Sequence, residues 1–480
     1  MNARRNRLVG SLVVIIALVV LAGTPAAAQT FNSGSTGADG PFSPASNTTL
    51  ALPPTGVFNF TTITIPSGVT VTFTKNAANT PVILLATGAV TISGTINVSG
   101  GNGGALGRPG SGGPGGFDGG AGGDGVTTTT AGAGLGPGGG TQGVNCQGSG
   151  GSYGTQGTPA FGTCTVIGPA GPTYGSPLLR PIVGGSGGSG GSAGGVPGTP
   201  GGSGGGGGGA LLIASSGTLT LNSGSQLLAD GGGGGSAGNF GGGGGSGGAI
   251  RLIAPTITTT GNLLARGGAQ GGGFTGAGGL GRIRLEAYTL TVSGGARTPE
   301  PTQGFPQPVF PGTGQPSLII ANIGGIAAPA TPSGNFLAAP DILLPTGTTN
   351  PVAVALTASN IPLGTVIQVT ATPQSGSRTT ATSSGLTGSL ASSTATASIN
   401  LSLTQTNVLT ATTTFPLVAS AGGGPIYAGG LVPSPASGGI EGLAPSFVEG
   451  EEVTHVRVAA VFGGGSRVIY LTRSGREINP

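Results

Sequence analysis

The chain has 480 residues, of which 108 are glycine and 37 are proline, and only 6% are charged. This length allows two or three domains with a sizeable core, but the composition is unlike that of an ordinary cytosolic enzyme. The formal net charge of +4 falls to +1 once Arg4, Arg5 and Arg7 leave with the leader described next, since 13 of the 16 basic residues then face 12 acidic ones. The charge therefore predicts no nucleic-acid partner.

Residues 1–28 have the pattern of a secretory signal peptide. A basic start precedes an apolar run from Leu8 to Ala22, and the small residues Ala26 to Ala28 fit cleavage before Gln29. This run is short for a membrane span, and no later run is apolar enough for an anchor. We expect an exported protein, secreted or held at the cell surface, with no membrane span after removal of the signal.

Residues 29–296 contain one repeated pattern. Four copies, in ranges 82–101, 209–232, 248–268 and 281–295, each hold two or three short strands and close on Gly-Gly. A single copy could not bury its apolar side, so the copies should stack as coils of a β-solenoid. Strand-like runs at 57–65 and 69–74 supply its first coil or its cap.

Glycine-rich insertions interrupt this solenoid at 102–209, 231–248 and 267–281. Glycine recurs at every third position between Gly107 and Gly125, and period three is the turn of an extended polyproline II helix. If the coils are in register, the insertions leave at one corner and can form one layer; the alternative is a flexible linker. Cys146 and Cys164, the only cysteines, are predicted to form a disulfide in an exported chain.

The C-terminal third has a different composition. A proline-rich linker is predicted at 297–316, and residues 317–418 are rich in Thr, Ser, Ala and Val. Short strands there, including one at 341–345, predict an immunoglobulin-like or fibronectin-like β-sandwich. The tail, 419–480, should contain a hairpin of 453–462 and 467–472, either a docking element or a polar cap. The predicted fold class is all-β: a short parallel β-helix with glycine-rich, polyproline-II-like insertions, then a sandwich.

The apolar, turn-bounded strands of residues 47–295 resemble the right-handed parallel β-helix of the pectin-lyase-like class, which is common among exported bacterial proteins. The resemblance implies a coil architecture in which lyases hold calcium with several carboxylates on adjacent coils and use Arg or Lys as a base. In composition, the insertions are similar to the glycine-rich repeats of mycobacterial surface proteins and to glycine-rich antifreeze proteins with layered polyglycine helices.

Two groups of charged residues emerge when the copies are aligned. Asp230 and Arg266 occupy equivalent positions on adjacent coils, ~4.8 Å apart, and should form an ion pair; one carboxylate does not make a calcium site. Arg251 stacks over Arg284, with Arg282 and Glu286 on the same strand face, which is a candidate ligand-binding patch or, alternatively, a solvated face. No catalytic residue, metal site or cofactor is predicted.

Pairs of the form Thr-x-Thr recur in the strands. They occur at residues 62–64, 70–72, 218–220, 256–258 and 289–291, a pattern similar to the faces of ice-binding solenoids. Such faces need the pair in register on every coil, and Val90-Thr91-Ile92 interrupts the row. Threonine is also simply a favourable strand residue.

Three functions follow as hypotheses. The first is a non-enzymatic surface or extracellular-matrix protein for adhesion or polysaccharide binding, with extracellular polysaccharide or cell-surface components as partners. The second is a polysaccharide lyase or hydrolase on a β-helix, which requires clustered carboxylates. The third is an ice-binding protein, which requires a flat threonine ladder.

Overall fold

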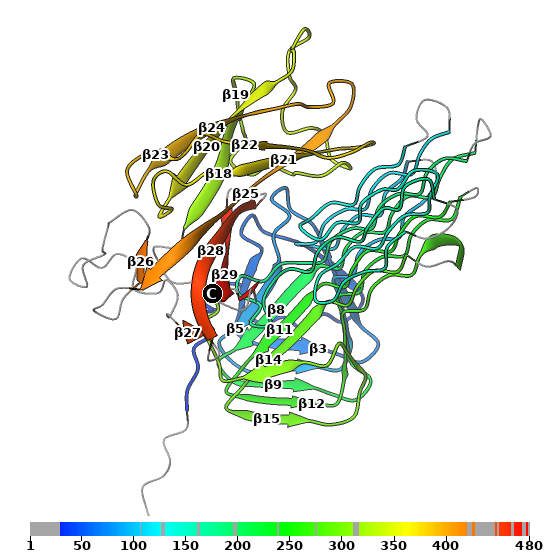
Figure 1. The fold of residues 1–480 in the computed structure, drawn as a ribbon. Coiled ribbons are helices and arrows are strands. Elements are labelled where there is room, and N and C mark those ends of the chain that lie inside the picture. The colour runs from blue at the N-terminus through cyan, green and yellow to red at the C-terminus, as the bar shows by residue number, and fades with distance from the viewer. Residues whose placement is uncertain are drawn as a thin grey trace, which may run out of the picture.

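In the computed structural model, residues 29–415 are described with their side chains, apart from residue 106 and the ranges 126–129, 161–163, 195–198, 238–239, 274–275 and 311–315. After residue 415 only the backbone of the strands up to Ile478 is described. The predicted signal peptide and much of the predicted tail lie outside the described residues. The chain forms a parallel solenoid, a glycine-rich layer and an antiparallel sandwich (Figure 1), which confirms the predicted fold class.

The solenoid has three parallel sheets, which each coil visits in the order C, A, B. Sheet A contains β3 (Ile63–Ile65), β6 (Val90–Ile92), β9 (Thr218–Leu221), β12 (Thr256–Thr259) and β15 (Thr289–Val292). Sheet B contains β1 (Thr48–Ala51), β4 (Thr70–Thr74), β7 (Thr95–Asn97), β10 (Gln226–Leu228), β13 (Asn262–Leu264) and β16 (Arg297–Thr298). Sheet C contains β2 (Val57–Phe60), β5 (Val82–Ala86), β8 (Ala210–Ser215), β11 (Ala249–Ile253), β14 (Arg282–Glu286) and β17 (Thr302–Gly304).

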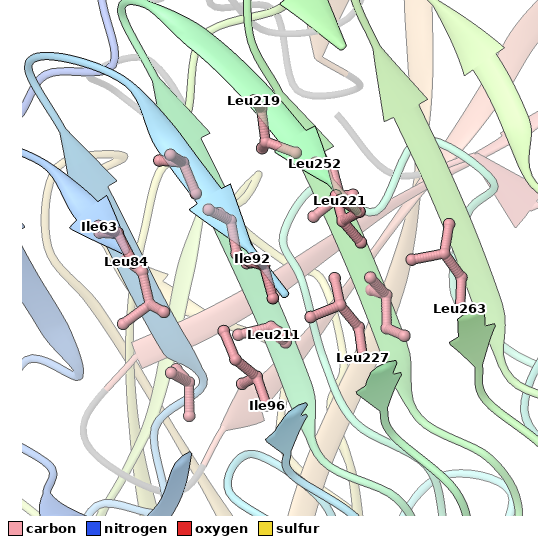
Figure 2. Packing of buried hydrophobic residues seen from close by; sticks show 14 of the residues in the cluster. Ile63, Leu84, Ile92, Ile96, Leu211, Leu219, Leu221, Leu227, Leu252 and Leu263 are labelled. Atoms are coloured by element: carbon pink, nitrogen blue, oxygen red, sulfur yellow. The ribbon is translucent and has the colours of Figure 1, made fainter. Parts of the chain in front are cut away.

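The core of the solenoid consists of columns of aliphatic side chains. Alternate strand residues point inward, so the same position on successive coils stacks in register. Leu84, Ile213, Leu252 and Leu285 form one such column in sheet C, and Figure 2 shows the packing of side chains from all three sheets. Each fully buried Leu or Ile contributes about 1.5–3 kcal/mol to folding, so the stack of coils supplies the burial that one copy lacks.

All three glycine-rich insertions leave the solenoid at the corner between sheets B and C. They connect β7 to β8, β10 to β11 and β13 to β14, and the last includes a short 3-10 turn at Gly271–Gly273. In Figure 1 they run side by side away from the coils. The prediction of a common exit corner is therefore confirmed.

The insertions form one layer held by backbone hydrogen bonds with a period of three. Gly201, Gly204 and Gly207 donate to residues 123, 120 and 117; Gly202, Gly205 and Gly208 donate to residues 240, 243 and 246. Ser203 and Gly206 donate to a third neighbour, at residues 104 and 101. One extended segment thus bonds to three others, one through each face of its threefold turn. The flexible-linker alternative is wrong for these segments.

The described strands between residues 317 and 478 form two antiparallel sheets. The first has the order β19 (Ile326–Ala327), β18 (Ser317–Ile323), β20 (Val352–Ser359), β24 (Ser393–Ile399) and β23 (Thr387–Gly388). The second has the order β22 (Thr379–Thr382), β21 (Gln368–Pro373), β25 (Asn407–Ala419), β28 (Glu451–Val461), β29 (Gly465–Thr472) and β30 (Glu477–Ile478), with β26 (Pro425–Tyr427) on β25 and β27 (Phe447–Val448) on β28. Side chains from both sheets, such as Val354 and Val369, share one core.

Three details differ from the sequence predictions. Residues 297–304 of the predicted linker continue the solenoid as β16 and β17, because their backbones extend the ladders of sheets B and C. Residues 341–345 form no strand. The predicted tail hairpin forms as β28 and β29, but β28 pairs with β25, so the hairpin extends the sandwich instead of forming a separate element. The assignment to the immunoglobulin-like class stays a prediction.

The sandwich is attached to the glycine-rich layer by polar contacts. Arg378 donates to the carbonyl oxygen of Gly134 at 2.6 Å, and Ser375 donates to the carbonyl oxygen of Thr130 at 2.6 Å. Burial lowers the pKa of Arg378, because desolvation disfavours its charge. The layer is therefore a structural link between solenoid and sandwich.

Candidate functional site

The predicted arginine patch is a buried ion cluster. The Glu286 carboxylate accepts hydrogen bonds from Arg251 Nε at 3.1 Å, Arg251 Nη2 at 2.9 Å and Arg284 Nε at 2.7 Å. Arg251 and Glu286 are 0% exposed. Burial is the main reason that the pKa of Arg251 is lowered, and the charge of Glu286 opposes that effect. The Glu286 carboxylate thus bridges the two stacked guanidinium groups and offsets one of their two positive charges.

Residues that follow the last solenoid strand cover this cluster. The backbone N–H of Gln307 donates to Glu286 Oε2 at 2.9 Å, and Arg251 Nη2 approaches the carbonyl oxygen of Pro308 at 3.5 Å. Strand β17 adds a further coil beside β14. The expectation of an open ligand-binding patch is therefore corrected, and so is the alternative of a solvated face, because the segment predicted as a linker folds over these side chains.

Arg282 belongs to a different environment from the other three residues of the predicted patch. Its Nη2 donates to the carbonyl oxygen of Tyr174 at 3.3 Å, and its guanidinium carbon lies 5.7 Å from the centre of the Tyr153 ring. Tyr153 and Tyr174 come from the first glycine-rich insertion and pack on sheet C with Leu179 and Ile182. This insertion therefore covers part of the outer face of sheet C.

The predicted ion pair is present. Arg266 Nη2 lies 2.6 Å from Asp230 Oδ2, and the backbone N–H of Arg266 donates to Asp230 Oδ1 at 2.7 Å. The hydrogen bonds to Asp230, followed by its charge, raise the pKa of Arg266. The arginine side chain is 54% exposed, so the pair contributes little to stability.

The predicted disulfide between Cys146 and Cys164 is also present. Cys146 is buried in the glycine-rich layer, and its backbone N–H donates to Ser192 Oγ at 3.2 Å. Val144 and Val166 pair beside it. The disulfide thus closes a loop between residues 146 and 164, and Cys146 anchors this loop in the glycine-rich layer.

The outer face of sheet A carries threonine in two columns. One column runs through all five strands: Thr64, Thr91, Thr220, Thr258 and Thr291 are successive register partners. The second contains Thr218, Thr256 and Thr289, with Thr62 at the equivalent position on the first coil. All these side chains are exposed or half-buried, whereas alternate residues such as Ile63 and Leu219 point into the core. We call these two columns the threonine face.

The coil of residues 89–92 lacks a complete threonine pair, as the sequence indicated, but only one of the two columns is interrupted. Thr91 continues the other column, because it pairs with Thr64 and Thr220. The departure is Ala89, which stands immediately before Val90 and leaves one gap in the second column. The signal that reveals this is the alternation itself, because Val90 and Ile92 are core residues and the threonine between them must point outward.

The threonine face lies at the side of the solenoid remote from the sandwich and the glycine-rich layer (Figure 1). The pair at residues 70–72 belongs to β4 of sheet B and is not part of it. Adjacent coils repeat every ~4.8 Å, and alternate residues along a strand repeat every ~6.6 Å, which sets the spacing of the two columns. The strands of this face carry no charged residue. The result is a regular, neutral array in which each threonine offers one methyl and one hydroxyl group.

A groove of about 810 Å³ lies on the sandwich between β18, the loop of residues 328–348 and residues 401–409. Its lining includes Ile319, Leu343 and Leu403, of which Leu343 is 77% exposed. Asp341 accepts backbone hydrogen bonds from Ser333 and Gly334. This carboxylate therefore stabilises the conformation of the loop of residues 328–348.

Within the described ranges, no group of three or more His, Cys, Asp or Glu side chains could hold a metal ion. The part of the chain that the structure describes also includes no helix that is long and apolar enough to cross a membrane. No family model, curated protein or solved structure matches the chain.

Proposed function

We propose that this chain is an exported, non-enzymatic surface or matrix protein that attaches to extracellular polysaccharide through its threonine face. The observation that carries the proposal is the in-register column of threonines on all five coils, on a side that the sandwich and the layer leave open. The signal-peptide pattern of residues 1–28 supports export. The resemblance of residues 47–295 to the pectin-lyase-like class is a resemblance in coil architecture, and this architecture is common among exported bacterial proteins.

The face suits an extended, repetitive ligand. A β-branched side chain has few rotamers, so each hydroxyl group is held in a narrow range of positions. Each hydroxyl group can both donate and accept a hydrogen bond, which matches the hydroxyl groups of a sugar chain. The binding energies of many weak contacts sum only when the ligand repeats along the coil direction with the spacing of the threonines. An ordered solid polysaccharide should therefore bind more tightly than a short oligosaccharide.

The positions of the acidic groups support a non-enzymatic role. Glu286 is enclosed by two arginines, Asp230 pairs with Arg266, and the buried Asp118 lies 3.5 Å from Lys75. A β-helix hydrolase or lyase requires carboxylates gathered where substrate can reach them. These three carboxylates are instead occupied within the fold.

Ice is the second candidate ligand for the same face. The strands of sheet A carry no aromatic ring on which a sugar could stack. A neutral array of methyl and hydroxyl groups can instead order water by hydrogen bonding and by apolar contact together. This observation favours ice binding and requires that both ligands be tested in parallel.

The test uses the chain from residue 29 onward, with solid and soluble polysaccharides in pull-down assays and with ice recrystallisation in a parallel assay. Thr220→Lys, at the centre of the complete column, should weaken binding about tenfold, because a charge and a long side chain break the array. Thr74→Lys, at an exposed position on sheet B, should leave binding unchanged.

Sugar release and unsaturated products are measured in the same tubes. Product formation would contradict the non-enzymatic proposal. Two results would exclude the threonine face as the binding site. One is an equal loss of binding in Thr220→Lys and Thr74→Lys, and the other is that the unsubstituted chain binds neither solid polysaccharide nor ice. Inhibition of ice growth without polysaccharide binding would favour the second candidate.

A further inference from the structure

The two ends of the solenoid are built differently. At the N-terminal end, Phe42 forms a parallel bridge with Ile63 and stacks on Phe60, with 5.0 Å between ring centres. Phe58 and Phe73 extend this aromatic cluster, which packs on the core. Backbone hydrogen bonds join the segment around Phe42 to β3 and its flanking residues. The first coil is therefore closed by aromatic side chains and by a bridging segment.

At the C-terminal end, sheet A ends on an open edge. β15 pairs with β12, and no described residue pairs with its other side. The backbone N–H groups of Thr289 and Ser293 donate toward β12, so the alternate groups of Leu290 and Val292 point to the free side. Leu290 and Val292 face the core but are only half-buried, because no further coil of sheet A covers them.

Exposed apolar surface accompanies this edge. Phe305, directly after β17, is 68% exposed, and its ring centre lies 6.3 Å from that of Tyr288, directly before β15. β15 itself contains no charged residue, no proline and no bulge, which are the devices that normally prevent edge strands from pairing. An open ladder beside an exposed aromatic ring is suited to pairing with another strand.

We propose that a second copy of this chain covers this end, so that two solenoids meet about a twofold axis with β15 antiparallel to β15 of the second copy. The capped first coil blocks head-to-tail stacking, which leaves the isologous, closed arrangement. Residues 289–296 are uncharged, and the neighbouring Arg297 lies 3.6 Å from Glu300, so the end does not repel itself.

The dimer has a consequence for binding. A twofold axis perpendicular to sheet A keeps both outer faces on the same side, so the two threonine faces become one continuous array. Linking two faces raises the apparent affinity for an extended solid without any new contact, through the effective concentration of the second face. The association itself does not rest on the proposed ligand, and its test is independent of binding.

The experiment is light scattering after size exclusion of the chain from residue 29 onward, over a range of concentrations. We expect a species of twice the chain mass at high concentration. Leu290→Lys should shift it to the single-chain mass, because it places a charge at the half-buried apolar end of the core that the second copy would cover. Circular dichroism and the melting temperature check that this variant folds.

Single cysteines give a second readout that does not depend on a destabilising change. Antiparallel pairing about a twofold axis brings one residue opposite its own copy. If the axis passes at Thr289 or Thr291, the cysteine variant of that residue alone should form an intermolecular disulfide. If the axis passes at Leu290, residue 289 of one copy lies opposite residue 291 of the other, and a mixture of Thr289→Cys and Thr291→Cys should form it. Ser43→Cys at the capped end is the control and should stay uncrosslinked. Single-chain mass at every concentration, or crosslinking only through Ser43→Cys, would overturn the proposal.

Discussion

Gly232→Ala is expected to lower the free energy of unfolding by about 3 kcal/mol, the upper part of the range for overpacking a well-packed interior. A Cβ at this position would overlap the carbonyl group of Gly101 on the adjacent segment. Gly206 also donates to that carbonyl oxygen, and Gly232 donates to Gly206, so a shift that relieved the overlap would break these bonds. Denaturant unfolding of the purified variant measures the loss.

Gly233→Ala is the matched control at the next residue. A Cβ there would lie no closer than 3.5 Å to its nearest neighbour, and the backbone is outside the left-handed region that favours glycine. Alanine also restricts the unfolded chain, so this variant should be neutral or more stable by about 0.4–1 kcal/mol. Equal destabilisation by both substitutions would mean that close packing of the glycine-rich layer does not limit stability.

Glu286→Gln is expected to lower the free energy of unfolding by about 3–5 kcal/mol, because removing one member of a buried ion cluster leaves the others uncompensated. Arg251 would lose the counter-charge that it meets through both Nε and Nη2, and Arg284 would lose the counter-charge that it meets at 2.7 Å. Chemical denaturation followed by circular dichroism provides the measurement.

Asp230→Asn provides the comparison for Glu286→Gln, because it weakens the exposed ion pair with Arg266 on the same solenoid. It should change stability by roughly 0 to 1 kcal/mol, since solvent screens an exposed pair. Replacing Arg251, Arg284 and Glu286 together by apolar residues of similar volume should recover most of the lost stability. An effect of Glu286→Gln as small as that of Asp230→Asn would argue against a dry, buried cluster.

The charged residues show where sequence reasoning succeeded and where it stopped. Alignment of the copies correctly placed Asp230 beside Arg266 and Arg251 beside Arg284, because residues at one position of a repeat stack at coil spacing. The alignment could not predict that Arg251 and Glu286 are buried. Gln307 and Pro308 contact the cluster, and the first insertion packs on the outer face of the same sheet; neither segment follows the repeat.

The threonine face shows a different limit. The Thr-x-Thr pairs are visible in the sequence, but the register between Thr64, Thr91 and Thr220 depends on which residues of each coil enter the core. A shift of one residue would turn every threonine inward. The long first insertion also separates Thr91 from Thr220 in the chain, which hides the fact that they are neighbours in the sheet.

The sequence by itself determined the coil architecture, the common exit corner of the insertions and the pairing of repeated positions, because copies of one repeat that stack in register bring equivalent positions together. Only the tertiary structure decided which solenoid faces are covered. Sheet C is covered in part by the first insertion and by Gln307 and Pro308, while the threonine face of sheet A stays open. Coverage depends on contacts between segments far apart in the chain, and such contacts leave no periodic signal in the sequence.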